Sequence, residues 1–192
     1  MLPGSVAGYT LPFQPGWKII ELGGGSNPLK LPRLTIVNAD VRWAPGVDVP
    51  GVNLNYPLPF ADEGFDGVYA SFVMEHLSWR KADLLPREIH RILKPGGVAV
   101  LVLANLYEQC RQAVRRFEEG QTWQAVSEFI FGSQEFGLQW DAGAHHVGFS
   151  PKEAFRLFRE AGFLRVEVKP WPLSETDMVI EAWRSGAIIR VG

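Results

Sequence analysis

The 192-residue chain has few of the features that would cross-link it, anchor it in a membrane or give it a high net charge. A single cysteine, Cys110, excludes an intramolecular disulfide and a cysteine-rich metal cluster. Nineteen Lys and Arg residues against 21 Asp and Glu residues give a net charge of −2, so no bulk basic field is available for nucleic acid or an anionic membrane. The longest apolar run, residues 98–104, is far shorter than the roughly 18 residues that span a bilayer.

Residues 1–16 lack a basic start and an unbroken apolar stretch, so the sequence does not predict a secretion signal there. They read instead as an irregular N-terminal arm that either packs onto the domain or lies over a pocket. Residues 17–192 are expected to form one domain, because their number suits a single core. The lone cysteine fits a reducing compartment, and we therefore expect a cytoplasmic protein without membrane association.

Strand and helix patterns alternate through the middle of the chain. A helix is expected over residues 82–93, with Asp83 as its N-cap, and another after the capping box of Ser150, Pro151 and Glu153. The alternation predicts an α/β fold of the Rossmann-like type, with a mostly parallel twisted sheet and helices on both faces. The expected strands are residues 17–22, 34–39, 65–72, 98–103, 164–168, 179–183 and, less regularly, 187–191.

Two connections are too short for the usual crossover helices. Only twelve residues separate Leu22 from Thr35, which predicts a truncated first crossover helix. The link from Asp40 to Val47 has no room for a helix, so we do not expect a full-length third strand. A helical insertion is expected at about residues 106–131, with an apolar face through Tyr107, Cys110, Val114 and Phe117.

The most informative stretch is the turn that follows the first strand, residues 21–28, with the sequence ELGGGSNP. Glycines allow the backbone to approach a ligand that side chains would block. A nicotinamide site requires G-x-G-x-x-G and a following helix, but Pro28 takes the third glycine position and the helix is nearly absent. The pattern acid-x-G-x-G-x-(G or N) is matched throughout, because Asn tolerates the left-handed conformation.

This second pattern resembles the first motif of class I S-adenosylmethionine-dependent methyltransferases. The resemblance extends to the acid at Asp40, which ends the second strand, and to a series of later segments in the same order. These segments are LPF-x-D at 58–62, F-D-x-V at 65–68, E-H-L at 75–77, R-x-L-K-P-G-G at 91–97, H-x-x-F-S at 146–150 and A-G-F at 161–163. Together they cover about three quarters of the chain.

The resemblance implies transfer of a methyl group from S-adenosylmethionine to a small-molecule acceptor by in-line displacement, with S-adenosylhomocysteine as product. Asp40 is expected to accept hydrogen bonds from both ribose hydroxyls, as a carboxylate can. Any proton lost by the acceptor is expected to pass to a histidine, which titrates near neutrality: His76, His145 or His146. The expected cofactor-binding residues are Glu21, Gly23, Gly24, Gly25, Asn27, Asp40, Val41, Asn53, Leu54 and Ser71.

Several alternatives stay open at this point. Asn53 and the three histidines also have purely structural interpretations, as a turn amide and as satisfied loop or helix-start side chains. The whole chain is also compatible with a non-catalytic S-adenosylmethionine-binding partner subunit or, less well, with a nicotinamide-dependent oxidoreductase. No metal site and no nucleic-acid partner are expected, and the sequence leaves the acceptor and the oligomeric state undetermined.

Overall fold

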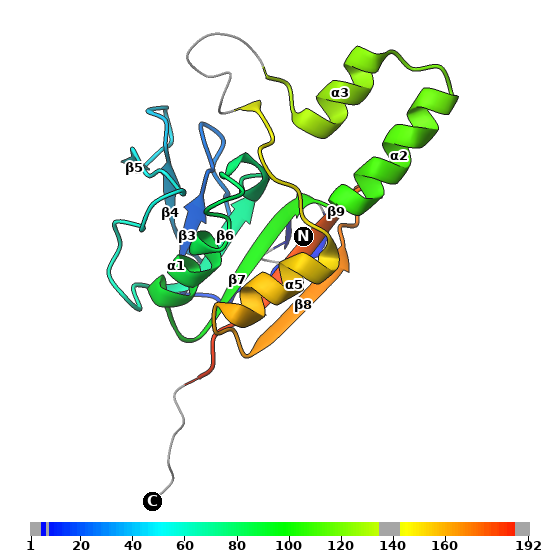
Figure 1. Cartoon of the computed structure of the whole chain (residues 1–192). Coiled ribbons are helices and arrows are strands. Elements are labelled where there is room, and N and C mark those ends of the chain that lie inside the picture. The colour runs from blue at the N-terminus through cyan, green and yellow to red at the C-terminus, as the bar shows by residue number, and fades with distance from the viewer. Residues whose placement is uncertain (1–4, 7, 135–142, 187–192) are drawn as a thin grey trace, which may run out of the picture.

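A seven-stranded sheet forms the centre of the computed structural model, which describes residues 5–6, 8–134 and 143–186 (Figure 1). The strand order is β5-β4-β3-β6-β7-β9-β8. Pairing is parallel from β5 to β7, and β9 runs antiparallel to both of its neighbours. The mostly parallel α/β sheet expected from the sequence is therefore confirmed. Its strands are β3 (Lys18–Leu22), β4 (Thr35–Asp40), β5 (Val49–Pro50), β6 (Phe65–Ser71), β7 (Leu93–Ala104), β8 (Arg165–Pro170) and β9 (Asp177–Trp183).

The first strand of the sheet, β3, lies between β4 and β6. The chain therefore builds the sheet outwards from β3 in one direction, to β4 and β5, and then returns to build it in the other direction through β6 and β7. Such a reversal of strand order leaves a crevice beyond the carboxyl ends of the strands, where ligands bind in open α/β sheets.

The helices that pack on the sheet, α1 (Leu84–Ile92) and α5 (Pro151–Glu160), share one face. Leu85, Ile89 and Phe158 are fully buried there in one apolar cluster. Where the sequence analysis expects helices on both faces, the opposite face carries a second cluster in which Leu11 and Phe13 cover the strands. These two residues belong to the N-terminal arm, which also contains the short pair β1 (Ser5–Val6) and β2 (Tyr9–Thr10).

Within the described part of the chain, no helix contributes to the cluster on that face, and the arm covers it instead. Residues 23–34, between β3 and β4, contain no helix, which confirms the truncated first crossover. Residues 41–48 form only turns and bends before β5, which pairs with β4 over two residues. A parallel pairing this short fits a connection without a crossover helix.

The helix ends follow the sequence signals in part. Ser150 caps α5 by accepting a hydrogen bond from the backbone N–H of Glu153, 3.2 Å away, and Pro151 occupies the first turn. Asp83 precedes α1 as expected, but its side chain makes no capping hydrogen bond. A single 3-10 turn, η1 (Met74–His76), was not expected from the sequence.

Two further helices, α2 (Leu106–Glu118) and α3 (Trp123–Phe131), form a hairpin that projects away from the sheet in Figure 1. The expected apolar face of α2 is wrong: Tyr107, Val114 and Phe117 are each more than half exposed, and Cys110 is exposed as well. The residues of α2 that are buried are Gln109 and Ala113. Helical periodicity correctly predicted that these residues form a helix. No segment in the described part of the chain covers the apolar face of α2. The expected strand at 187–191 lies outside the described residues.

Candidate functional site

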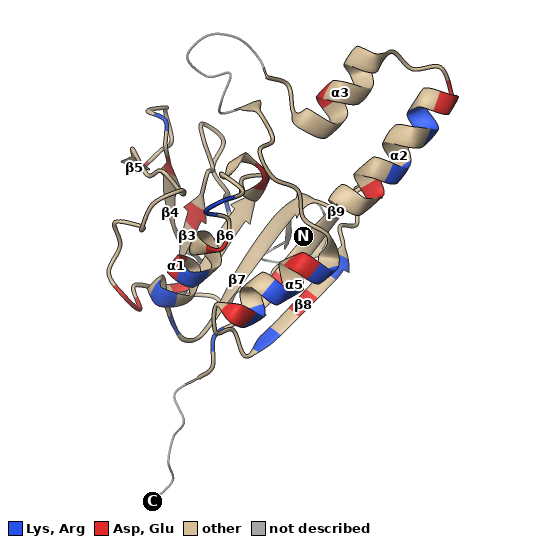
Figure 2. Ribbon diagram, viewed as in Figure 1, with Lys and Arg blue, Asp and Glu red and all other residues tan. Residues whose placement is uncertain are grey.

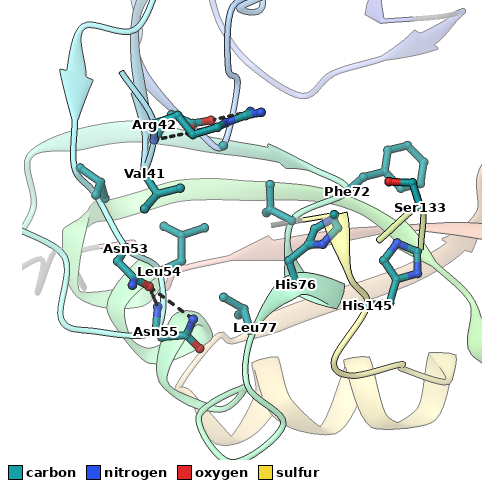
Figure 3. A pocket seen from close by; sticks show the side chains of 15 residues that line it. Val41, Arg42, Asn53, Leu54, Asn55, Phe72, His76, Leu77, Ser133 and His145 are labelled. Atoms are coloured by element: carbon teal, nitrogen blue, oxygen red, sulfur yellow. Dashed lines mark hydrogen bonds and ion pairs between the residues drawn. The ribbon is translucent and has the colours of Figure 1, made fainter. Parts of the chain in front are cut away.

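A cavity of about 710 Å³ lies at the carboxyl ends of β3, β4 and β6. This is the point at which the strand order reverses. Figure 3 shows its walls: the loops after β4 and β5 on one side, and His76 and His145 on the other. A volume of this size is ordinary for a cofactor or small-molecule site. The lining residues are Gly23, Asp40, Val41, Arg42, Val52, Asn53, Leu54, Asn55, Phe72, Val73, His76, Leu77, Ser133, Gly143 and His145.

Gly23 places bare backbone against this cavity. Its φ of +77° lies in the left-handed region, and an ideal Cβ built on it would lie 2.2 Å from Cγ1 of Val73. A side chain at position 23 would therefore be strained and would also push Val73, which itself lines the cavity. The first glycine of the turn is required by both conformation and space.

Two buried side chains, Glu21 and Asn38, form hydrogen bonds that hold the rest of the glycine turn. The Glu21 carboxylate accepts one from the backbone N–H of Leu29 at 2.6 Å, and burial raises the pKa of Glu21 although that bond acts in the opposite direction. Asn38, which the sequence analysis did not identify, donates from Nδ2 to the carbonyl oxygens of Gly25 and Gly46 at 2.8 and 2.7 Å. Both side chains thus shape the loop from below and do not line the cavity.

The Asp40 carboxylate is buried at the end of β4 and lines the cavity. One oxygen, Oδ2, accepts a hydrogen bond from the backbone N–H of Gly25 at 3.0 Å, which links the acid to the glycine turn. The other, Oδ1, accepts from the backbone N–H and the Nε of Arg42. Burial raises the pKa of Asp40, but the bonds from Arg42 and Gly25 outweigh it and hold the pKa below its usual value, so the group is anionic at neutral pH.

Loop residues after β5 form the wall opposite the histidines. Asn53 and Leu54 line the cavity, together with Val52 and Asn55. The Asn53 side-chain oxygen accepts hydrogen bonds from the backbone N–H and Nδ2 of Asn55, and the Asn55 side-chain oxygen accepts one from the backbone N–H of Ser78. These bonds fix the edge of the cavity in one shape.

The histidine side of the cavity is built from two rings in contact. The ring centroids of His76 and His145 lie 5.1 Å apart, with an angle of 67° between the ring planes. Nδ1 of His76 lies 2.9 Å from the carbonyl oxygen of Ala144, so the neutral ring donates there and keeps Nε2 as an acceptor. Burial lowers the pKa of His76, and the neighbouring His145 and His146 lower it further.

The structure brings together seven of the residues singled out from the sequence around this cavity: Gly23, Asp40, Val41, Asn53, Leu54, His76 and His145. Gly24, Gly25 and Glu21 support the turn behind the lining, and Asn27 and Ser71 do not line the cavity. His146 lines a second, smaller cavity instead. The lining residues that sequence reasoning missed are Arg42, Val52, Asn55, Phe72, Val73, Leu77, Ser133 and Gly143; the positive φ of Phe72, +51°, is a local strain that no sequence pattern announces.

The chain is similar to known methyltransferases in sequence and in fold. Residues 36–101 match the family model described as a methyltransferase domain. A solved structure from Thermotoga maritima, described as an S-adenosylmethionine-dependent methyltransferase and possible histamine N-methyltransferase, superposes with a TM-score of 0.57 at 21% identity. The superposition covers 90% of this chain and 84% of that one. A second such methyltransferase, from Methanosarcina mazei, gives a TM-score of 0.58 at 19% identity over 91% and 95% of the two chains.

The fold is that of S-adenosylmethionine-dependent methyltransferases, and residues 36–101 are similar in sequence to a methyltransferase domain. Among curated sequences, it is 30% identical over 130 residues to the demethylmenaquinone methyltransferase of Geobacillus kaustophilus, which covers 63% of this chain and 51% of that protein. It is also 30% identical over 104 residues to an uncharacterized methyltransferase of Synechocystis. The chain spans about half the length of these curated relatives.

The residues present fit the cofactor that this methyltransferase fold implies. The bare backbone at Gly23, the anionic Asp40 and a cavity of about 710 Å³ at the switch point suit a nucleoside that carries no phosphate. A dinucleotide fits less well, because residues 23–34 contain no helix whose N-terminus would face a pyrophosphate. Among the described residues no group of three or more His, Cys, Asp or Glu side chains is arranged to hold a metal ion.

Proposed function

We propose that the protein transfers a methyl group from S-adenosylmethionine to a small-molecule acceptor by in-line displacement. The observation that carries the proposal is the juxtaposition, in one switch-point cavity, of the Gly23 backbone and the Asp40 carboxylate. Asp40 would accept the ribose hydroxyls, the backbone of the glycine turn would lie along the methionyl end, and Asn53 and Leu54 would flank the adenine. The bound cofactor supplies an activated methyl group, and S-adenosylhomocysteine is the product.

His76 is the residue that we assign to proton transfer. It lines the cavity, it is neutral at physiological pH because burial lowers its pKa, and its Nε2 is the acceptor nitrogen of the ring. A hydroxyl or amine acceptor loses a proton when it is methylated, and a neutral imidazole within reach accepts it. His145, in ring contact with His76, would position that ring; His146, which lines the other cavity, is a weaker candidate.

Two observations support a small-molecule acceptor. One relative is a demethylmenaquinone methyltransferase and another is described as a possible histamine N-methyltransferase, and both of these acceptors are small molecules. The net charge of −2 gives no support for a nucleic-acid substrate. No described helix is long and apolar enough to cross a membrane. The lone, exposed thiol of Cys110 supports a reducing, cytoplasmic location.

Calorimetric titration with S-adenosylhomocysteine tests the proposal directly. We expect the wild-type protein to bind and Asp40→Ala to bind at least tenfold more weakly. Asp83→Ala, which removes an exposed acid that does not line the cavity, should bind as the wild type does. No binding by the wild type would refute the cofactor assignment, and stabilisation by NAD in its place would revive the nicotinamide alternative. Tight binding without turnover over a broad acceptor panel would favour the non-catalytic subunit.

A further inference from the structure

Phe72, the first residue after β6, has a backbone conformation that is costly for its residue type. Its φ of +51° lies in the left-handed region, which glycine and asparagine adopt more readily than phenylalanine does. Three other non-glycine residues among those described have a positive φ: Arg33, Glu63 and Gln134. These three are polar, exposed and away from the cavity lining, whereas Phe72 is apolar and lines the proposed active site.

The turn at Phe72 is part of the cavity wall. The backbone N–H of Phe72 donates to the carbonyl oxygen of Val102 at 2.8 Å, which holds residue 72 at the carboxyl end of the sheet. After this residue the chain places the Val73 side chain against the backbone of Gly23, and η1 then brings His76 to the cavity. The turn accounts for the conformation at position 72 but not for the phenyl ring, since glycine or asparagine would supply that conformation at lower cost.

The side chain of Phe72 does not serve the core. Phe72 is 43% exposed, and it belongs to neither of the two apolar clusters that the described residues form on the faces of the sheet. Backbone strain of this kind is concentrated at active sites and ligand-binding segments, where it is part of the function. The ring that this strained backbone carries is therefore available to a ligand in the cavity.

Phe72 shares one side of the cavity with the two histidines. Figure 3 shows Phe72, Ser133, His76 and His145 together on the side opposite Asn53. Three of these four side chains are rings, and the rings of His76 and His145 already contact each other. Aromatic rings attract other rings in offset or edge-on arrangements, beyond the effect of the area that they bury. This side of the cavity therefore favours a planar aromatic group over an aliphatic group of similar size.

The charged groups of the cavity lie elsewhere. Its described lining residues include one acid and one base, Asp40 and Arg42, and these two pair with each other. On the side of Phe72 the polar side-chain groups are the Ser133 hydroxyl and the imidazoles, and His76 is neutral because burial lowers its pKa. An ionised group on the acceptor would lose its hydration there without gaining a counter-charge, whereas a hydroxyl group would donate to an imidazole nitrogen.

We propose that Phe72 selects the methyl acceptor and that this acceptor is a neutral phenol, whose ring packs against the ring of Phe72. The inference rests on the proposed function, since it takes the same cavity as the place of methyl transfer. The phenol oxygen bonds to the methyl carbon, the electron pair of the broken carbon–sulfur bond stays on sulfur, and the phenol proton passes to Nε2 of His76. The positive charge thereby moves from the sulfonium to the imidazolium.

Nuclear magnetic resonance with two small alcohols tests this assignment. Protein saturated with S-adenosylhomocysteine would be titrated with phenol and, separately, with cyclohexanol, which has nearly the same size and a hydroxyl group but no aromatic ring. We expect phenol to bind at least fivefold more tightly, with nuclear Overhauser effects between its protons and the Phe72 ring. Phe72→Leu should abolish this preference, and Phe155→Leu, at an exposed phenylalanine of α5 that does not line the cavity, should keep it.

The charge requirement is tested with ring compounds that differ from phenol in their ionised group. Benzoate and benzylammonium, titrated at the same ionic strength, should each bind at least fivefold more weakly than phenol. Binding of either ion as tight as that of phenol would contradict the neutral acceptor.

Urea unfolding gives a readout that a structural role of the ring would move in the opposite direction. Phe72→Asn relieves the left-handed strain and removes the ring, so its unfolding midpoint should equal or exceed that of wild type while its phenol affinity falls at least fivefold. A lower midpoint, equal wild-type affinities for phenol and cyclohexanol, or undiminished phenol binding by folded Phe72→Leu would overturn the inference and leave the proposed methyl transfer intact. Failure of S-adenosylhomocysteine to bind, with phenol still in contact with Phe72, would instead refute the proposed function.

Discussion

Arg42 lies against the carboxylate of Asp40, with Nε 3.1 Å from Oδ1 and Nη2 3.3 Å from Oδ2. Backbone N–H groups of Arg42 and Gly25 bond to the same two oxygens. The acid that is proposed to receive the ribose hydroxyls therefore already has protein donors on both sides. Of these donors the guanidinium is the one that can leave, because the Arg42 side chain is half exposed and the backbone groups are fixed.

Arg42→Gln is expected to tighten binding of S-adenosylhomocysteine by about two- to fivefold. An ion pair with an exposed partner is worth only about 0–1 kcal/mol, and the variant removes the cost of breaking it while both backbone donors stay in place. Calorimetry at low and high salt would measure the effect, with Arg87→Gln, in an exposed pair with Asp83, as the control. A tenfold loss of affinity would show instead that Arg42 holds the carboxylate in its binding position.

Gly23→Ala is expected to destabilise the protein by about 2 kcal/mol or more and to weaken S-adenosylhomocysteine binding more than tenfold. The new methyl group would meet both a left-handed backbone and Cγ1 of Val73. Gly120→Ala is the matched control, because Gly120 has φ of +80° but nothing within 4 Å of its ideal Cβ. Denaturant unfolding and calorimetry on both variants separate the strain of the left-handed backbone from the steric clash with Val73. Equal losses of stability and affinity in the two variants would contradict the role given to Val73.

Phe13→Ala is expected to reduce the free energy of unfolding by about 3 kcal/mol and to leave the affinity for S-adenosylhomocysteine unchanged. Phe13 is 8% exposed and packs in the apolar cluster on the face of the sheet that carries neither α1 nor α5. None of the described residues of the arm, 5–6 and 8–16, lines the larger cavity. Leu173→Ala, at an exposed leucine, is the control for unfolding, and a faster release of the cofactor product from Phe13→Ala would mean that the arm acts as a lid after all.

Glu75 is expected to make the protein less stable as the pH rises. Burial raises its pKa from 4.5 to about 7 on folding, so the folded protein holds a proton that the unfolded chain has lost between these values. The stabilising contribution is complete below pH 4.5 and is lost as the pH rises through 7, a change of roughly 3 kcal/mol.

Comparison of wild type with Glu75→Gln isolates this effect. The lowered pKa values of His76 and His90 make both proteins more stable as the pH rises, and this shared contribution cancels in the difference. The free energy of unfolding of wild type minus that of the variant should fall between pH 4.5 and 7. Urea unfolding in half-unit pH steps would measure this difference, and a difference independent of pH would show that folding does not raise the pKa of Glu75.

The strands and the α1 and α5 helices were predictable because they are short-range patterns. Each expected strand of the central sheet agrees with the structure to within a few residues, although β7 begins earlier than expected, at Leu93. The order of the strands along the chain, with a glycine after one strand and an acid at the end of the next, was enough to place Gly23 and Asp40 at the carboxyl edge of the sheet. The capping signal at Ser150 was equally local.

What sequence patterns missed depends on contacts between distant segments. Arg42 and Phe72 line the cavity from loops whose conformation follows no periodicity, and Asn38 acts on the glycine turn from the neighbouring strand. The exposure of Tyr107 and Phe117 could not be anticipated either, since an apolar stripe does not state whether a neighbour covers it. The second cavity at Glu75 arises only where η1, β7 and the hairpin meet.

The arm that replaces helices on one face of the sheet imposes an order of assembly on the chain. The Tyr9 hydroxyl donates a hydrogen bond to Glu181, 172 positions later, and the Tyr9 ring lies 5.3 Å from that of Trp171. During synthesis these partners leave the ribosome long after residues 9–13, so the arm must wait undocked until the last strands have paired. Closing so long a loop is entropically slow, and we therefore expect arm docking to be a late event in folding.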